Sequence, residues 1–125
     1  MLETRAARYS QHKERQAINF ESKQIQRALK NLKKDRGYLI VLDSKGKKIS
    51  SEALARFLKS KQELGINSFT FIIGGAYGLS DEIKKDADMI LSLSDMTFTH
   101  EMTRLILVEQ IYRAASINAG SPYHH

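Results

Sequence analysis

Apolar positions follow a helical period in one part of the chain and form short continuous runs in three others. Over 20–34 they recur every three or four residues, which predicts an amphipathic helix. The runs at 38–42, 68–73 and 89–93 are short and apolar, which is typical of buried strands. Residues 2–9 fit either an edge strand or a frayed helix, and we favour the strand.

Three further helices are predicted from capping residues and the segments that follow them. Ser50 precedes an apolar stripe, Ser80 precedes the short segment 81–86, and Thr99 precedes a segment that ends near Ala115. Serine and threonine are preferred before a helix because their hydroxyl groups accept a hydrogen bond from its first turn. Helices and strands therefore alternate, which predicts an α/β fold with a parallel sheet and helices on both faces.

The composition excludes several classes of protein. The 125 residues fit one domain, 1–125, and 42% hydrophobic with 27% charged residues is typical of a globular chain. Cysteine is absent, which excludes a disulfide scaffold, a thiol nucleophile and a thiolate zinc site. No apolar run approaches the length of about 20 residues that a membrane helix needs. We therefore expect a cytoplasmic protein without a membrane span.

The positive charge is concentrated in the first part of the chain. Up to Lys48 there are 13 basic and 5 acidic residues, a net charge of +8, and the remainder has 7 basic and 9 acidic residues, a net charge of −2. A basic segment beside a nearly neutral one is typical of a protein that binds a polyanion, because phosphate contacts release counterions. A basic surface that serves only solubility is the alternative, and charge alone leaves both open.

Three loops follow the predicted strands, at 42–44, 74–78 and 93–98, and in a parallel sheet they meet at one edge. Ligands of open α/β sheets bind at this edge. The middle loop has the pattern Gly-Gly-x-x-Gly, whose glycines let a ligand approach the main chain. It is neither a dinucleotide nor a phosphate-loop motif, so by itself it favours a turn that needs glycine for geometry alone.

The last predicted helix is apolar on nearly all sides, which is typical of a helix buried in a core or against another subunit. Glu109 and Arg113 interrupt it one turn apart, which favours an ion pair. His100 has Arg104 four residues later, which argues against a zinc pair and fits an anionic or hydrogen-bonding substrate group. The alternative is an exposed pair without a role. We expect no metal.

Four motifs occur in a specific order and spacing. They are Ile72-Ile-Gly-Gly-Ala-Tyr-Gly-Leu79, Leu91-Ser-Leu-Ser-Asp-Met-Thr-Phe-Thr-His100, Leu107-Val-Glu-Gln-Ile-Tyr-Arg-Ala114 and Pro122-Tyr-His-His. In this combination the chain resembles the ribosomal large-subunit rRNA methyltransferase H family of the SPOUT class, over residues 21–125. Relative to that family it lacks about one strand and one helix before the segment 2–9, so we expect a shortened domain.

The resemblance implies a homodimer with a deep C-terminal trefoil knot that shapes the cofactor pocket. It also implies methylation of N3 of a pseudouridine in helix 69 of 23S rRNA, on the assembled ribosome, with S-adenosylmethionine as the donor. The residues that it places against the cofactor are Leu42, Gly74, Gly75, Gly78, Leu93, Ser94, Asp95, Met96, Thr97 and Phe98. Those that it places near the reacting groups, as catalytic candidates, are His100, Arg104, Arg113, Tyr123 and His124.

Two alternative functions stay open at this point. A shortened chain that keeps the fold without methylating would be an RNA-binding or cofactor-binding remnant of the family. A small nucleotide-binding enzyme of ordinary doubly wound topology would share the order of elements. If the chain is a methyltransferase, either His100 accepts the proton of N3 of the base or Arg104 favours the anion that N3 forms.

Overall fold

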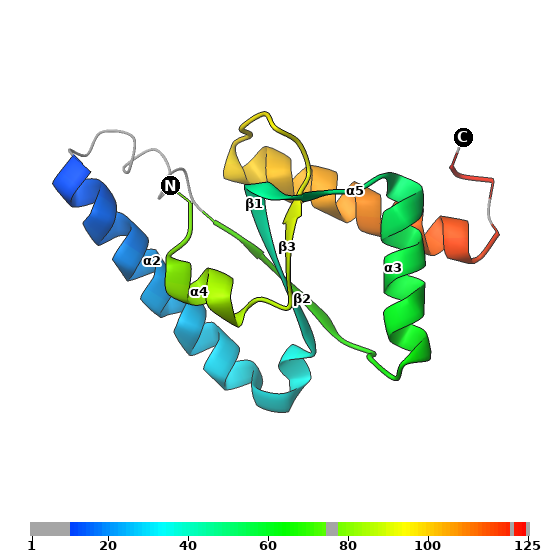
Figure 1. The fold of residues 1–125 in the computed structure, drawn as a ribbon, viewed down its shortest axis with the longest axis horizontal. Coiled ribbons are helices and arrows are strands. Elements are labelled where there is room, and N and C mark those ends of the chain that lie inside the picture. Colours follow the sequence, from blue (N-terminus) through cyan, green and yellow to red (C-terminus); the bar gives the residue numbers. More distant parts are fainter. Residues whose placement is uncertain (1–10, 75–77, 121, 125) are drawn as a thin grey trace.

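The computed structural model describes residues 11–74, 78–120 and 122–124, and these form a layered α/β arrangement (Figure 1). The elements in chain order are helix α2 (Gln11–Leu32), the 3₁₀ helix η1 (Lys33–Arg36), β1 (Tyr38–Lys48), α3 (Ser51–Glu63), β2 (Phe69–Ile73), α4 (Asp81–Asp86), β3 (Met89–Ser92) and α5 (His100–Asn118). The predicted strand at 2–9 lies outside the described residues.

The three strands form one parallel sheet in the order β2-β1-β3, so β1 is central. Tyr38 lies opposite Phe69 of β2, and Ile40 lies opposite Met89 of β3. Helix α3 leads from β1 to β2, and α4 leads from β2 to β3. The α/β class and the parallel sheet are thereby confirmed, and all three strands end at the same edge.

Helices cover both faces of the sheet (Figure 1). On one face, Leu39 and Val41 of β1 are fully buried in a cluster with Ile83 of α4, and Ile25 and Leu29 of α2 pack against it. The other face has apolar clusters of its own, formed with α3 and α5. Because helices cover both faces, the strands are continuous apolar runs instead of alternating ones, as predicted.

Helix α2 and strand β1 are longer than the sequence pattern predicts. The helix begins at Gln11 and not at residue 20. Residues 11–19 extend it because they favour helices by their intrinsic propensity, although they do not continue the periodic apolar pattern. The strand continues through the loop predicted at 42–44 and ends at Lys48. Leu42 and Lys47 both lie opposite Leu91 of β3, so the four residues between them bulge out of register.

Helix α5 is only partly buried within this chain. Leu107 and Ala114 are buried in the clusters under the sheet. Of the two predicted surroundings of this helix, a core or another subunit, the core of the single chain covers only part of it, because an apolar face on its outer side is exposed. That face consists of Met102, Leu105, Val108 and Tyr112. Burial against another subunit stays a prediction.

Replacing Gly37 with alanine is expected to lower the free energy of unfolding by about 3 kcal/mol. Gly37 precedes β1 with φ +62°, and an added Cβ would lie 2.1 Å from the carbonyl oxygen of Ser68. That oxygen cannot retreat freely because it accepts a hydrogen bond from the amide of Tyr38. Urea unfolding measures the change.

Gly65→Ala is the matched control for this variant. Gly65 also has a positive φ, of +93°, but open space surrounds its Cβ position. We expect it to cost only the conformational penalty of about 1 kcal/mol. Equal losses in the two variants would contradict a steric role for the contact with Ser68.

Candidate functional site

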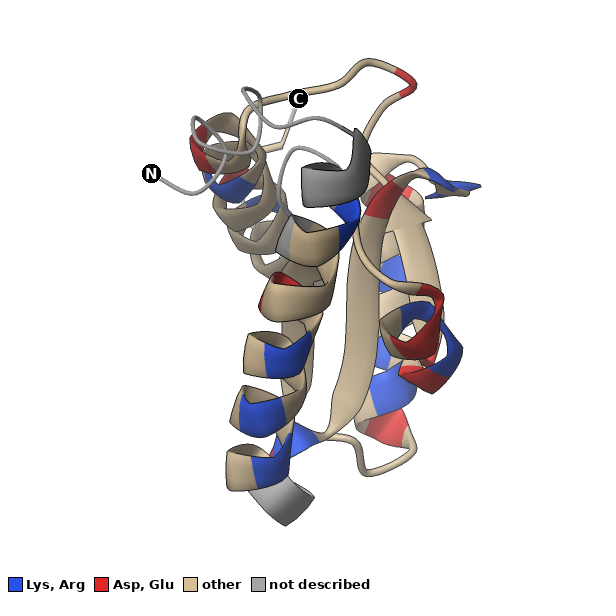
Figure 2. Cartoon of the chain, turned by 90° about the vertical axis from the view of Figure 1, so that its left-hand side faces the viewer, with Lys and Arg blue, Asp and Glu red and all other residues tan. Residues whose placement is uncertain are grey.

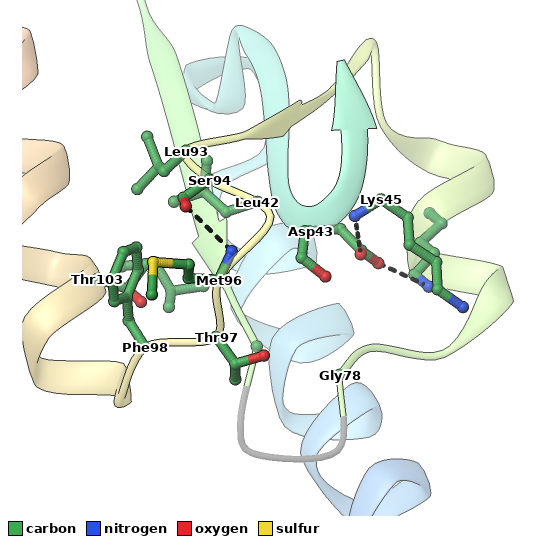
Figure 3. A pocket seen from close by; sticks show the side chains of 14 residues that line it. Leu42, Asp43, Lys45, Gly78, Leu93, Ser94, Met96, Thr97, Phe98 and Thr103 are labelled. Carbon is green, nitrogen blue, oxygen red and sulfur yellow. Dashed lines mark hydrogen bonds and ion pairs between the residues drawn. The ribbon is translucent and has the colours of Figure 1, made fainter. Parts of the chain in front are cut away.

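A cavity of about 320 Å³ opens at the edge of the sheet where the three strands end (Figure 3). Its walls come from the bulge in β1, which occupies the position of the predicted first loop, from the end of β2 and the loop after it, and from the loop after β3, together with one residue each from α4 and α5. The lining residues are Leu42, Asp43, Ser44, Lys45, Ile73, Gly74, Gly78, Lys84, Leu93, Ser94, Met96, Thr97, Phe98 and Thr103. The predicted convergence of the three loops is therefore confirmed.

The loop after β3 is held in shape by its own serines. Ser92 donates its hydroxyl to the carbonyl of Ser94 at 3.0 Å. The hydroxyl of Ser94 in turn accepts from the amide of Met96 at 3.0 Å (Figure 3). Such side-chain hydrogen bonds fix a turn locally without a regular element. Thr99 then caps α5 by accepting from the amide of Met102. The loop thus presents a preformed wall to the cavity.

An ion pair connects the β1 bulge to α4 at one side of the cavity. Oδ2 of Asp43 lies 2.8 Å from Nζ of Lys84, and Oδ1 accepts from the amide of Lys45 at 2.9 Å (Figure 3). Partial burial tends to raise the pKa of Asp43, but the hydrogen bonds from Lys84 and Lys45 prevail and lower it. Asp43 is therefore a charged carboxylate that holds the loop in place at neutral pH.

The structure brings together eight of the ten residues that the resemblance assigned to the cofactor. Gly75 lies outside the described residues. Asp95 is exposed, forms an ion pair with Lys48 and does not line the cavity. The eight residues that share the cavity are Leu42, Gly74, Gly78, Leu93, Ser94, Met96, Thr97 and Phe98.

A second group of polar side chains, which we call the tail cluster, joins the C-terminal segment to α5 and α3. It consists of Glu52, Glu109, Arg113, Tyr123 and His124. Arg113 contacts Glu109 at 2.6 Å, as predicted, and also Nδ1 of His124 at 2.8 Å. Nε2 of His124 lies 2.7 Å from Glu52, and Tyr123 donates its hydroxyl to Glu109 at 3.2 Å. Residues from three separate segments thus meet in one network.

The hydrogen bonds of His124 define its tautomer in this network. Arg113 can only donate, so Nδ1 of His124 accepts and the ring proton sits on Nε2, which donates to Glu52. The hydrogen bond from His124 lowers the pKa of Glu52, and that from Arg113 lowers the pKa of Glu109. Burial and the hydrogen bond to Glu109 raise the pKa of Tyr123. Glu52 and Glu109 are therefore charged carboxylates as long as they accept these hydrogen bonds from His124 and Arg113.

We expect the C-terminal segment to detach as the pH falls below about 4.3, the ordinary pKa of glutamate. Because the folded-state pKa values of Glu52 and Glu109 are lowered, their contacts contribute fully above that value. They are lost only as the pH falls through the lowered values. The ring resonances of Tyr123 in an NMR titration report the release, and resonances that stay unchanged until the whole chain unfolds in acid would contradict it.

The predicted catalytic residues fall into two separate places in one chain. His100 begins α5 beside the cavity-lining Thr103, and Arg104 follows on an exposed position of the first turns. Arg113 lies thirteen residues after His100, which is about 20 Å along a helix. Arg113, Tyr123 and His124 share the tail cluster, so a single chain does not bring all five residues to one point.

Two residues of the site, Lys84 and Glu52, had no assigned role in the sequence-based prediction. The charged side chains at the cavity are those of Asp43, Lys45 and Lys84. Of these, only Asp43 belongs to the loops that were predicted to converge. Lys84 gave no signal, because its contact with Asp43 joins segments about 40 residues apart. Glu52 gave no signal either, because its contact with His124 joins segments 72 residues apart. Long-range pairs of this kind leave no periodic trace in a sequence.

The chain is similar to known proteins over most of its length. The profile of a family described as "Predicted SPOUT methyltransferase" matches residues 1–124. A protein named ribosomal RNA large subunit methyltransferase H from Halothermothrix orenii is 53% identical over 104 residues, 83% of this chain and 65% of that protein. Proteins of the same name from Geotalea daltonii and Dictyoglomus thermophilum are 48% and 53% identical over 80% and 78% of this chain.

The chain matches less than two thirds of the length of these relatives. The matched share of the proteins from Geotalea daltonii and Dictyoglomus thermophilum is 65% and 63%. Among the described residues, no helix combines the length and apolar character that crossing a membrane requires. The same residues contain no group of three or more histidine or acidic side chains arranged to hold a metal ion.

Proposed function

Because the chain belongs to the SPOUT methyltransferase family, we propose that it methylates N3 of a pseudouridine in helix 69 of 23S rRNA with S-adenosylmethionine as the donor. The observation that carries the proposal is that loops from all three strands line one cavity, and that two of them contain the matching motifs. The intact cytoplasmic ribosome would be the substrate. A remnant that binds RNA or the donor without reacting is the alternative.

The residues around the cavity fit S-adenosylmethionine in size and chemistry. A volume of about 320 Å³ lies at the lower end of the range for small-molecule sites. Leu42, Ile73 and Leu93 offer apolar surface for an adenine ring, and Gly74 and Gly78 let main-chain groups approach polar atoms. The donor, when bound, supplies an electrophilic methyl group. The expected trefoil knot around this cavity stays a prediction.

The contribution of the chain itself is mainly to hold the reacting atoms in line, which supplies several kcal/mol of the barrier. N3 of the base must lose its proton as it accepts the methyl group. His100 at the start of α5 can accept that proton, and Arg104 can stabilise the resulting anion. Methyl transfer in a single turnover separates these roles: an unchanged rate in His100→Ala would exclude His100 as the base, and the loss should then appear in Arg104→Ala.

A homodimer would bring the separated catalytic candidates together. The exposed apolar face of α5 (Met102, Leu105, Val108 and Tyr112) consists of four large side chains on one helix, and exposed apolar patches are typical of protein–protein interfaces. Leu105 is 63% exposed in the single chain. Pairing of α5 helices from two chains would bury this face and could place the tail cluster of one chain near the cavity of its partner. Analytical ultracentrifugation of the wild type and of Leu105→Glu tests the pairing.

Transfer of a labelled methyl group to ribosomes from cells that lack the modification tests the function. We expect incorporation at one nucleotide, together with binding of S-adenosylmethionine and S-adenosylhomocysteine in calorimetry. Binding of the donor without transfer would favour the remnant. A thermal shift with ATP or NAD and none with S-adenosylhomocysteine would favour the nucleotide-binding enzyme and overturn the proposal.

A further inference from the structure

The outer face of α2 combines positive charge with an exposed aromatic ring. Phe20 is 57% exposed, and Lys23, Arg27 and Lys30 are exposed as well. At 100° per residue the four side chains fall within an arc of about 80° of the helix surface. Figure 2, which looks at the side of the molecule that α2 covers, shows the basic positions as a series of blue bands along the helix. We call this surface the α2 face.

No acidic group neutralises the α2 face from the described part of its own helix. Glu21 lies about 160° around the helix from Lys23. The described residues give none of the three cations an ion pair, in contrast to Lys84, which contacts Asp43. Glu82 of the neighbouring α4 approaches α2, but it meets the amide of Gln26 at 3.3 Å. The face therefore presents unpaired positive charge to solvent.

Among the described residues, the aromatic ring on this face belongs to none of the apolar clusters of the core. The buried side of α2 packs through Ile25 and Leu29, which lie on the opposite side of the helix from Phe20. A surface on which an exposed aromatic side chain lies among cations does not match an apolar surface of another protein. It fits single-stranded nucleic acid, in which bases stack on aromatic rings while the phosphates meet lysine and arginine.

We propose that the α2 face docks RNA, with Phe20 stacking on an unpaired base and Lys23, Arg27 and Lys30 contacting the adjoining phosphates. The proposal rests on the rRNA substrate proposed above and adds a contact surface distinct from the cavity. Helix α2 lies against α4 through Gln26 and Glu82, and α4 supplies Lys84 to the cavity. RNA bound along α2 would therefore lie near the cavity and lead away from the nucleotide that reacts there.

Two double variants, each of which removes two positive charges, distinguish a specific role of the α2 face from a general effect of positive charge. Lys23→Gln with Arg27→Gln removes two cations from the α2 face. The matched control, Arg56→Gln with Lys59→Gln, removes two exposed cations from α3, on the other side of the sheet. Binding of a fluorescent helix 69 hairpin is measured against salt concentration. We expect the slope of log K against log salt to fall by about 1.4 in the first pair and little in the second.

The aromatic contact is tested with the same hairpin and a fully paired duplex of equal length. Phe20→Ala is expected to weaken hairpin binding about tenfold and to leave duplex binding unchanged. The chain has no tryptophan, so Phe20→Trp introduces a unique indole. Its emission should be quenched by the hairpin and not by the duplex, and its affinity should match that of the wild type.

Several results would overturn the docking proposal. These are equal losses in the two charge pairs, an unquenched indole, or indole emission that changes with protein concentration alone, which would indicate self-association. Absence of hairpin binding by the wild type would also overturn it. Failure of the proposed function is a different result: no methyl transfer by the wild type, even where the hairpin binds and Phe20→Ala weakens it.

Discussion

Replacing Gly74 with valine is expected to weaken binding of the methyl donor by about a hundredfold. A Cβ at this position would lie 2.7 Å from Cγ of Leu79 and 3.3 Å from the carbonyl carbon of Gly78. Leu79 cannot give way easily, because it is 7% exposed and belongs to the apolar cluster under the sheet. The branched side chain must therefore displace the loop or enter the cavity that Gly74 lines.

Gly78→Ala is the control within the same loop. Gly78 has φ +85° and open space around its Cβ position, so alanine adds strain without a contact. We expect its affinity to fall less than about tenfold, since the conformational penalty is about 1 kcal/mol. Titration calorimetry with S-adenosylhomocysteine measures both variants, and circular dichroism checks that they fold. Unchanged affinity in Gly74→Val would mean that the loop after β2 does not contact the donor.

The sequence was sufficient to predict the architecture because local signals agreed with one another. The apolar runs at 38–42, 68–73 and 89–93 correspond to the three strands. Ser50, Ser80 and Thr99 cap α3, α4 and α5 as predicted. The cavity followed from this order, since parallel strands bring their carboxyl ends to one edge whatever the side chains are.

The remaining features depend on contacts between segments far apart in the sequence. Asp43 in the β1 bulge contacts Lys84 of α4, and no local pattern distinguishes the bulge from the loop that was predicted at 42–44. Likewise, His124 reaches Glu52, 72 residues away, and gives no periodic signal. The resemblance pointed to His124 as a candidate, but it did not indicate which partners hold the histidine.

Arg113→Met is expected to slow methyl transfer by about a hundredfold and to leave the affinity for the donor unchanged. Arg113 contacts Glu109 and His124, and its guanidinium lies 5.0 Å from the ring centre of Tyr123. Methionine retains much of the length but removes the contacts of Arg113 with Glu109 and His124, so the C-terminal segment keeps only the contacts of Tyr123 with α5 and of His124 with Glu52. The cavity is spared, because Thr103, where α5 lines it, lies about 15 Å away along the helix.

Two further variants show whether Arg113 acts through the C-terminal segment. Arg113→Lys keeps the charge but cannot contact Glu109 and His124 with one planar group, so we expect a rate between those of wild type and Arg113→Met. Deletion of residues 123–125 should slow the reaction as much as Arg113→Met, and combining the two should add nothing, because groups that act as a unit are not additive. Donor affinity that falls with the rate, or losses that multiply in the combined variant, would show that Arg113 supports the fold of α5 and does not position Tyr123 and His124 for the reaction.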